Sequence, residues 1–221
     1  MSKHWPPPTI VSVATAGHHH SAVDALVAAF AEDPTWSATL SGRPRRISVL
    51  RTALSVLSTD ASLRGSFLVA LIEGEVAGAA VGWPPFYHPS PLRTLRHTGA
   101  ALALLRHAGM ASVPLFRRWR ALHAADPTDS GHWHLAALGV RPDAQRRGVG
   151  RALLDAFLEP VDGSGGAAYL ETSRPDILAW YGAVGFRVRE RVSLPGGRTA
   201  WTMWRPPATI PRQSLPTAAG C

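Results

Sequence analysis

The stretch of the chain with the clearest chemistry is LGVRPDAQRRGVGRALL (138–154), which lies between an expected strand and an expected helix. Glycines at 148 and 150 let the backbone approach a bulky anion without obstruction by a Cβ atom. Free N–H groups and the helix dipole favour a phosphate at a helix N-terminus, and arginines at 146, 147 and 151 add positive charge. The stretch has neither the G-K-[ST] ending of a Walker loop nor a G-x-G-x-x-G fingerprint. The residues alone therefore predict a diphosphate cradle, with a glycine turn carrying exposed arginines as the plainer alternative.

Hydrophobic periodicity predicts the elements that must position this loop. Two apolar runs around Glu73-Gly74 predict a hairpin over 66–83. The other expected strands are 9–15, 132–140, 167–172, 185–194 and 198–205, and the expected helices are 21–32, 47–57, 151–158 and 175–182, with 86–131 irregular or helical. No internal repeat or composition break interrupts the pattern, so we expect one domain over residues 1–205 and an irregular C-terminal tail over 206–221.

Two separated motifs resemble those of the GNAT-type N-acetyltransferases. The family pattern V-x-P-x-x-[QR]-x-x-G-x-[GA] is matched by Val140, Pro142, Gln145, Gly148 and Gly150, and its later Y-x-x-x-G-F by Tyr181, Gly185 and Phe186. The resemblance covers roughly residues 9–205. It implies a single α/β domain with a central mixed, mostly antiparallel sheet of about six to seven strands, flanked by helices and splayed at an acetyl-CoA site. It also implies acetyl-CoA as the cofactor.

The resemblance also assigns the residues expected to bind acetyl-CoA. A strand that splays after a bulge would pair its backbone with the pantetheine arm at Leu138, Gly139 and Val140, so their side chains should matter little. The pyrophosphate would lie against the loop and helix start, formed by Gln145, Arg146, Arg147, Gly148, Val149, Gly150, Arg151 and Ala152. The plainer interpretation of 135–140 is a core strand, which it is in either case.

A closer likeness is to the puromycin N-acetyltransferase-like subgroup. The stretch LETSRPDILAWYGAVGF (170–186) is similar to that subgroup's L-E-T-S-x-P…FY…GF, and Trp133, Leu135, Ala136, Gly139 and Val140 match its W-x-L-A-x-x-G-V. Puromycin itself is not expected as the substrate, because the residues that shape its pocket are not recognisable in this sequence.

The resemblance places proton-transfer groups on two strands and a helix. Tyr181 corresponds to the general acid that protonates the departing thiolate. His134 lies six residues before Val140, where some relatives carry the base, and its imidazole titrates in a suitable range; a structural strand histidine is an equal alternative. His132, at the strand start, is the weaker candidate.

Glu171 interrupts an apolar strand and would accept the substrate ammonium, unless it only pairs with an arginine such as Arg174. Arg174 stands where the family often has a cofactor-binding asparagine, so that role is not carried over.

Aromatic and basic residues around the expected acceptor cleft allow two interpretations. Trp36, Trp83, Phe86 and Tyr87 would line an aromatic substrate pocket or simply pack in the core and loops. The insertion 86–131 is a natural place for substrate selectivity. Its arginines would bind an acidic substrate or form a solvated face: Arg93, Arg96, Arg106, Arg117, Arg118 and Arg120.

Composition limits the class of protein. The chain has 221 residues, 46% of them hydrophobic, a net charge of +8 and one cysteine, so neither disorder nor an internal disulfide framework is expected. The scattered arginines form no basic stripe, so no nucleic-acid partner is expected.

No apolar run reaches the length of a membrane span and no signal peptide is recognised, so we expect a cytoplasmic protein without a membrane partner. No metal is expected, since a solvated helix start accounts for His18–His20 better than a metal site does. We expect a monomer or homodimer.

These patterns lead to one principal hypothesis and two alternatives. The chain is expected to be an acetyl-CoA-dependent N-acetyltransferase that acts on the amine of a small molecule, such as an antibiotic or natural product. Within the same reaction class, the acceptor could be a protein lysine. The alternative from another class is a non-catalytic acyl-CoA-binding or sensing module.

Overall fold

A computed structural model describes residues 9–33, 36–37, 40, 42–62, 66–86, 106–107, 109, 112–127 and 130–208, with the backbone alone at 112, 116 and 119. Its strands are β1 (Ile10–Val13), β2 (Phe67–Ile72), β3 (Glu75–Trp83), β4 (His132–Val140), β5 (Ala167–Thr172), β6 (Arg187–Leu194) and β7 (Arg198–Arg205). Its α-helices are α1 (His19–Phe30), α3 (Arg43–Ser62), α6 (Ser112–Ala125), α7 (Val149–Gly163) and α8 (Leu178–Gly182), and its 3-10 turns are η1 (Ala16–His18), η3 (Pro142–Ala144) and η4 (Pro175–Ile177).

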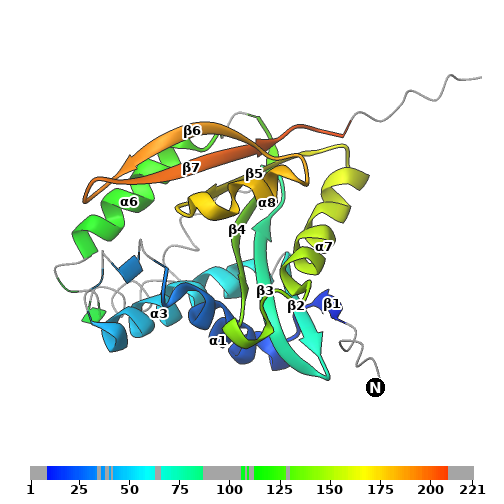
Figure 1. The fold of residues 1–221 in the computed structure, drawn as a ribbon, viewed down its shortest axis with the longest axis horizontal. Coiled ribbons are helices and arrows are strands. Elements are labelled where there is room, and N and C mark those ends of the chain that lie inside the picture. Colours follow the sequence, from blue (N-terminus) through cyan, green and yellow to red (C-terminus); the bar gives the residue numbers. More distant parts are fainter. Residues whose placement is uncertain are drawn as a thin grey trace, which may run out of the picture.

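The strands form one seven-stranded sheet in the order β1-β2-β3-β4-β5-β7-β6. All neighbouring strands are antiparallel except β4 and β5, which run parallel. Helices cover both faces, with α7 on one side of the central strands and α1 and α3 on the other (Figure 1). The expected mixed, mostly antiparallel sheet flanked by helices is therefore confirmed.

The central pair β4 and β5 separates part of the way along its length. Pairing of the two strands runs from His132–Ala167 to Leu135–Leu170 and ends there. Beyond that point β4 stays paired with β3 as far as Val140. The register to β3 shifts by one residue at Ala136, which is the extra residue of a bulge. A bulge increases the local twist and redirects a strand, so β4 leaves β5 where the bulge begins and opens a wedge in the sheet. The expected splay is confirmed.

The helix α7 holds one face of this wedge in place. Its apolar side buries Leu153, Leu154 and Phe157, each at most 3% exposed, against the sheet. Burial of side chains of this size contributes about 1.5–3 kcal/mol each. On the opposite face, α1 packs so closely on β4 that a Cβ atom added to Gly139 would lie 2.8 Å from the Cβ of Ala29. The strand is thus fixed between two helices.

Most expected elements appear close to their predicted bounds, and three differ clearly. The helix expected over 47–57 is longer at both ends and runs from Arg43 to Ser62. The helix expected over 151–158 extends to Gly163 and includes Pro160. Pro160 is exposed and lies in the last turn. It has no N–H group and donates no helix bond itself, yet the helix continues past it. The alternation expected over 185–194 is absent from the first half of β6, where Arg187 to Arg191 are all exposed. This strand is the sheet edge, and the buried residues at its end and in β7 pack on α6. Within the described part of the chain, no helix is both long and apolar enough to span a membrane.

Candidate active site

The loop between β4 and α7 ends in a helix start with no side-chain cap. Gly148 is the N-cap residue, with a left-handed φ of 84°, and no side chain caps this helix among the described residues. The first helical bond is donated by Ala152 N–H to Gly148 O, at 2.9 Å. The N–H groups of Val149, Gly150 and Arg151 precede it and are the donors that a helix start leaves free. The position of Gly148 therefore directs a group of N–H donors at one point.

The backbone of β4 faces the wedge at alternate residues. Arg141 N–H donates to Ala77 O on β3, at 2.9 Å. Because successive residues of a strand direct their N–H and C=O groups to opposite sides, Val140 and Leu138 direct theirs away from β3, towards the side that β5 has left. Gly139 directs its groups at β3, so the structure does not place its main chain in the wedge. Gln145 Nε2 donates to Val140 O at 3.1 Å and ties the loop to the strand end.

These two sets of groups lie side by side. A Cβ atom on Gly150 would lie 3.5 Å from Val140 Cγ2 and 3.9 Å from Leu138 Cδ2. The helix start and the open strand edge thus form one continuous surface of backbone donors and acceptors. Such a surface fits a long ligand with a pyrophosphate at one end and amide groups along its arm, as in coenzyme A.

The arginines of the loop divide into two groups. Arg141 pairs with Asp143, and Arg151 pairs with Asp155 one turn along α7. Arg146 and Arg147 are exposed, and Arg146 has a left-handed φ of 59°. Arg146 and Arg147 therefore add positive charge beside the helix start, and no carboxylate pairs with them as Asp143 and Asp155 pair with Arg141 and Arg151 among the described residues.

A histidine and a glutamate meet at the point where β4 and β5 diverge. His134 and Glu171 lie on opposite strands of the parallel pair, and His134 Nε2 lies 2.9 Å from Glu171 Oε2. Their side chains are 19% and 15% exposed. The alternative that Glu171 forms a salt bridge with Arg174 is wrong, because the Arg174 guanidinium pairs with Asp176 two residues away.

An aspartate that the sequence analysis did not select completes this cluster. Asp126 follows α6 directly, and its carboxylate lies 3.2 Å from His132 Nε2 and 3.8 Å from His134 Nδ1. His134 is thus flanked by a carboxylate on each ring nitrogen, while His132 is buried against Asp126, Tyr169 and Trp204. His132 is thus enclosed by these three side chains.

The charges of the cluster shift the pKa values of His134, Asp126 and Tyr169. Burial disfavours the charged form of His134, but Glu171 and Asp126 outweigh burial and raise the pKa of the imidazole. For Asp126, burial is again the largest influence, yet the hydrogen bond to His132 and the nearby histidines lower its pKa overall. Burial and the neighbouring Glu171 carboxylate raise the pKa of the Tyr169 hydroxyl. The cluster therefore holds a proton on His134 to higher pH than usual.

Tyr181 lies in the short helix α8 and is 7% exposed. Its ring packs between Trp180 and Phe186, with centroids 4.8 Å and 5.8 Å away. Trp180 in turn lies near Gly150, since a Cβ there would be 3.8 Å from Trp180 Cζ2. Burial raises the pKa of Tyr181 to about 12, although the Arg174 guanidinium opposes the shift. The hydroxyl therefore keeps its proton at neutral pH.

The aromatic residues expected around the acceptor have different surroundings. Trp83 ends β3 opposite His134, with ring centroids 5.5 Å apart. Trp36 packs against the clusters formed by α1 and α3 and lies beneath the Arg118 guanidinium. Phe86 is 76% exposed, and its ring lies so close to Gly131 that a Cβ atom there would be 2.3 Å from Phe86 Cζ. Tyr87 lies outside the described residues. Trp83 is thus placed against His134, whereas Trp36 lies against the Arg118 guanidinium.

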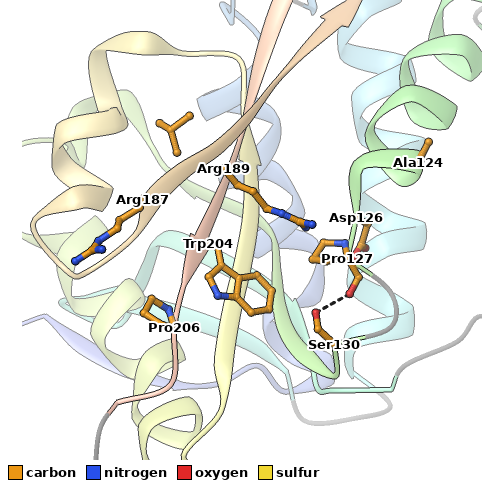
Figure 2. A pocket seen from close by; sticks show the side chains of 9 residues that line it. Ala124, Asp126, Pro127, Ser130, Arg187, Arg189, Trp204 and Pro206 are labelled. Atoms are coloured by element: carbon orange, nitrogen blue, oxygen red, sulfur yellow. Dashed lines mark hydrogen bonds between the residues drawn. The ribbon is translucent and has the colours of Figure 1, made fainter.

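A surface pocket of about 900 Å³ lies beside the cluster, between the end of α6 and strands β6 and β7 (Figure 2). Asp126, Arg187, Arg189 and Trp204 line it, and Ser130 closes one side by donating to Pro127 O at 2.8 Å. Asp126 of the cluster therefore borders this open pocket. Among the described residues, no group of three or more potential ligands could hold a metal ion.

Comparison with known proteins agrees with this geometry. The model of the acetyltransferase (GNAT) family matches residues 43–186, more than half of the chain. A histone acetyltransferase HPA2 and related acetyltransferase from Corynebacterium glutamicum has a similar structure, with TM-score 0.65, 24% identity, and coverage of 92% of this chain and 98% of that one. The polyamine N-acetyltransferase of Drosophila melanogaster, which forms N-acetylagmatine, has TM-score 0.61 and 15% identity over 89% and 99% of the two chains.

A third similar structure carries the coenzyme itself. The PaiA N-acetyltransferase of Thermoplasma acidophilum, solved with coenzyme A, has TM-score 0.56 and 11% identity over 90% of this chain and 99% of that one. The family match spans the strand, loop and helix described above, and the fold agrees along nearly the whole chain. The chain therefore belongs to the GNAT family of acetyltransferases, which use acetyl-CoA.

Proposed function

We propose that this acetyltransferase transfers acetyl from acetyl-CoA directly to the amine of a small molecule bound beside His134 and Glu171. The observation that carries the proposal is the 2.9 Å contact between these two side chains at the point where β4 and β5 diverge. A base is needed there, because an amine is mostly protonated at neutral pH and must lose a proton before it attacks. The polyamine acceptor of the Drosophila neighbour supports a small amine as the acceptor.

In this proposal the chain binds the coenzyme with backbone groups. The N–H donors of Val149, Gly150 and Arg151 hold the pyrophosphate at the start of α7, with Arg146 and Arg147 beside it. Leu138 and Val140 offer N–H and C=O groups to the pantetheine arm along the open edge of β4. When bound, acetyl-CoA supplies an acetyl thioester that an amine can attack. Two helices fix β4, so its edge is in position before the ligand arrives.

The acceptor amine would give its proton to the His134–Glu171 pair. Glu171 offers a carboxylate oxygen to the ammonium, and His134 shares the proton through its Nε2 contact. The sign of the pH dependence follows from the raised pKa of His134: below that pKa the imidazole is already protonated and the pair accepts poorly. The rate should therefore rise with pH through a value above the usual histidine range.

Tyr181 is proposed to act at the other end of the transfer. Its hydroxyl keeps a proton at Oη at neutral pH, and it can give that proton to the departing thiolate. Trp180 and Phe186 hold the ring in one orientation. A fixed donor needs no reorganisation at the moment of transfer.

Two alternatives to a small-molecule acceptor remain: a protein lysine as the acceptor, and a module that binds acetyl-CoA without transferring acetyl. The resemblance of 170–186 to the puromycin N-acetyltransferase-like subgroup supports an antibiotic or natural-product amine. A protein lysine is the alternative acceptor, to which the likeness to the Corynebacterium protein lends some support. A sensing module would bind acetyl-CoA without transfer, but the paired acid and base groups argue for catalysis.

A thiol-release assay with a panel of acceptors tests the proposal. Purified protein is incubated with acetyl-CoA and with polyamines, arylalkylamines, amine-bearing antibiotics or a lysine peptide, and free coenzyme A is measured. We expect release above the acceptor-free rate with at least one small amine, and its loss in Glu171→Gln. Release with the peptide alone would favour a protein acceptor. Binding of acetyl-CoA without release from any acceptor would favour the sensing module.

A further inference from the structure

The helix α6 brings one arginine, Arg118, into the interior on the acceptor side of the sheet. Leu115, one turn before Arg118, contacts the cluster of Leu40 and Val49, the second of which lies on α3. Ala121 and Leu122, one turn after it, pack against buried residues of β6 and β7. Arg118 therefore points inwards, between the two surfaces that α6 joins. Its neighbours Arg117 and Arg120 are exposed.

The guanidinium of Arg118 has donors that nothing in the described structure uses. Its Nη1 atom is buried and has no hydrogen-bond partner among the described residues. The guanidinium lies over the ring of Trp36, with Cζ 5.6 Å from the ring centroid. Stacking on an aromatic face stabilises the cation but leaves the in-plane N–H groups free. A buried donor without a partner costs free energy, which a ligand that accepts its hydrogen bonds would recover.

Two carboxylates, those of Asp33 and Glu171, act electrostatically on the Arg118 guanidinium. Burial is the largest influence on Arg118 and lowers its pKa, and the more distant charges of Asp33 and Glu171 oppose the shift only in part. The interior thus holds a cation within electrostatic reach of Glu171, the carboxylate that is proposed to receive the substrate amine.

We propose that Arg118 binds a carboxylate of the acceptor, so that the preferred substrate is an amine that also carries an acid group. This inference rests on the proposed function. The ammonium of such a molecule would lie at Glu171 and His134, and its carboxylate would accept N–H bonds from Arg118. The two protein groups carry opposite charges, so they favour one orientation of an amino acid over the reverse. Arginine and carboxylate form short, often bidentate hydrogen bonds that are stronger than neutral ones.

Matched acceptor pairs test this directly, because their members differ by one carboxylate. The pairs are tyrosine and tyramine, arginine and agmatine, and lysine and cadaverine, each measured by thiol release. We expect the wild-type protein to have a higher kcat/KM for the acid-bearing member of at least one pair. Arg118→Gln should reduce that kcat/KM by about 10- to 100-fold, as for the loss of a hydrogen bond to a charged group, while the value for the plain amine changes little.

Three controls separate a binding role from a structural one. Arg118→Lys keeps the charge and should restore part of the preference. Arg117→Gln removes the same charge from an exposed position one residue away and should behave as wild type. The thermal midpoint of each variant reports whether the fold is intact.

The outcomes distinguish this inference from the proposed function. Equal or better use of the plain amine in every pair, or an equal loss for both members in Arg118→Gln, would overturn the carboxylate role and leave the transferase proposal standing. Absence of thiol release with every member of every pair and with the wider amine panel would refute the proposed function itself, and the inference with it.

Discussion

The substitution Gly148→Ala should have two separate effects, one on the free energy of unfolding and one on the affinity for acetyl-CoA. Gly148 has φ 84°, and a Cβ atom built on it meets nothing within 4 Å. Alanine would therefore fit sterically, and its only cost is the left-handed backbone, about 1–2 kcal/mol of unfolding free energy. For a chain of this size that corresponds to a decrease of roughly 2–8 °C in the thermal midpoint.

The same substitution should weaken acetyl-CoA binding by a separate amount. A ligand that binds only the folded state at 100 times its Kd stabilises the protein by about 2.7 kcal/mol. The new methyl group, or a relaxed φ at residue 148, would turn the N–H donors of the helix start away from the pyrophosphate. A tenfold weaker Kd would reduce the stabilisation by about 1.4 kcal/mol. We expect a reduction of at least that size, measured by thermal or chemical unfolding with and without acetyl-CoA.

Gly196 offers a matched control. It lies in the turn between β6 and β7, with φ 80° and no atom within 4 Å of an added Cβ. Gly196→Ala should cost a similar unfolding free energy but leave the stabilisation by acetyl-CoA unchanged. Loss of the same fraction of that stabilisation in both variants, or no loss in Gly148→Ala, would contradict a role of the Gly148 backbone in binding the coenzyme.

Further predictions concern the proton-transfer groups. Tyr181→Phe should lower turnover by about 100-fold or more, as for loss of a general acid, with acetyl-CoA affinity retained because the ring still packs on Trp180; unchanged turnover would remove the acid role. Glu171→Gln should lower the pKa of His134 as well as the rate, and move any residual rate profile to lower pH, because its carboxylate raises that pKa. Asp126→Asn should move the profile in the same direction but less far, since its carboxylate lies 3.8 Å from the imidazole rather than 2.9 Å. Histidine titration by nuclear magnetic resonance measures both shifts, and an unshifted His134 in either variant would contradict the assigned charges.

The sequence predicts the part of the site that depends on local pattern. The apolar run at 132–140 gives β4 its observed bounds, and the spacing of Gly148 after Val140 marks the loop and the helix start. The proximity of His134 and Glu171 could be anticipated because both lie on expected strands, at positions that the family resemblance assigns to one cleft. A bulge before the open stretch 138–140 was expected from the resemblance, but its position at Ala136 was not, since no residue type in 135–140 marks it.

Asp126 and Arg118 could not be selected in this way. Both lie in the insertion 86–131, where no clear periodicity shows which residues of α6 face inwards. Arg118 was one of six arginines with identical side chains, and only the packing of Leu115 and Leu122 on different neighbours sets its direction. The absence of alternating burial in the first half of β6 has the same origin. Which residues of β6 are buried depends on packing against α6, which is distant in sequence. Tertiary packing decides these features.

The most direct measurement of the central claim is a coenzyme A titration followed by amide chemical shifts. If backbone groups of the wedge hold the coenzyme, the amide resonances of Leu138, Val140 and residues 148–151 should shift together and saturate with one Kd. Gly196 and the residues around it should shift far less. Saturable binding that leaves the resonances of 138–151 unmoved would contradict the account.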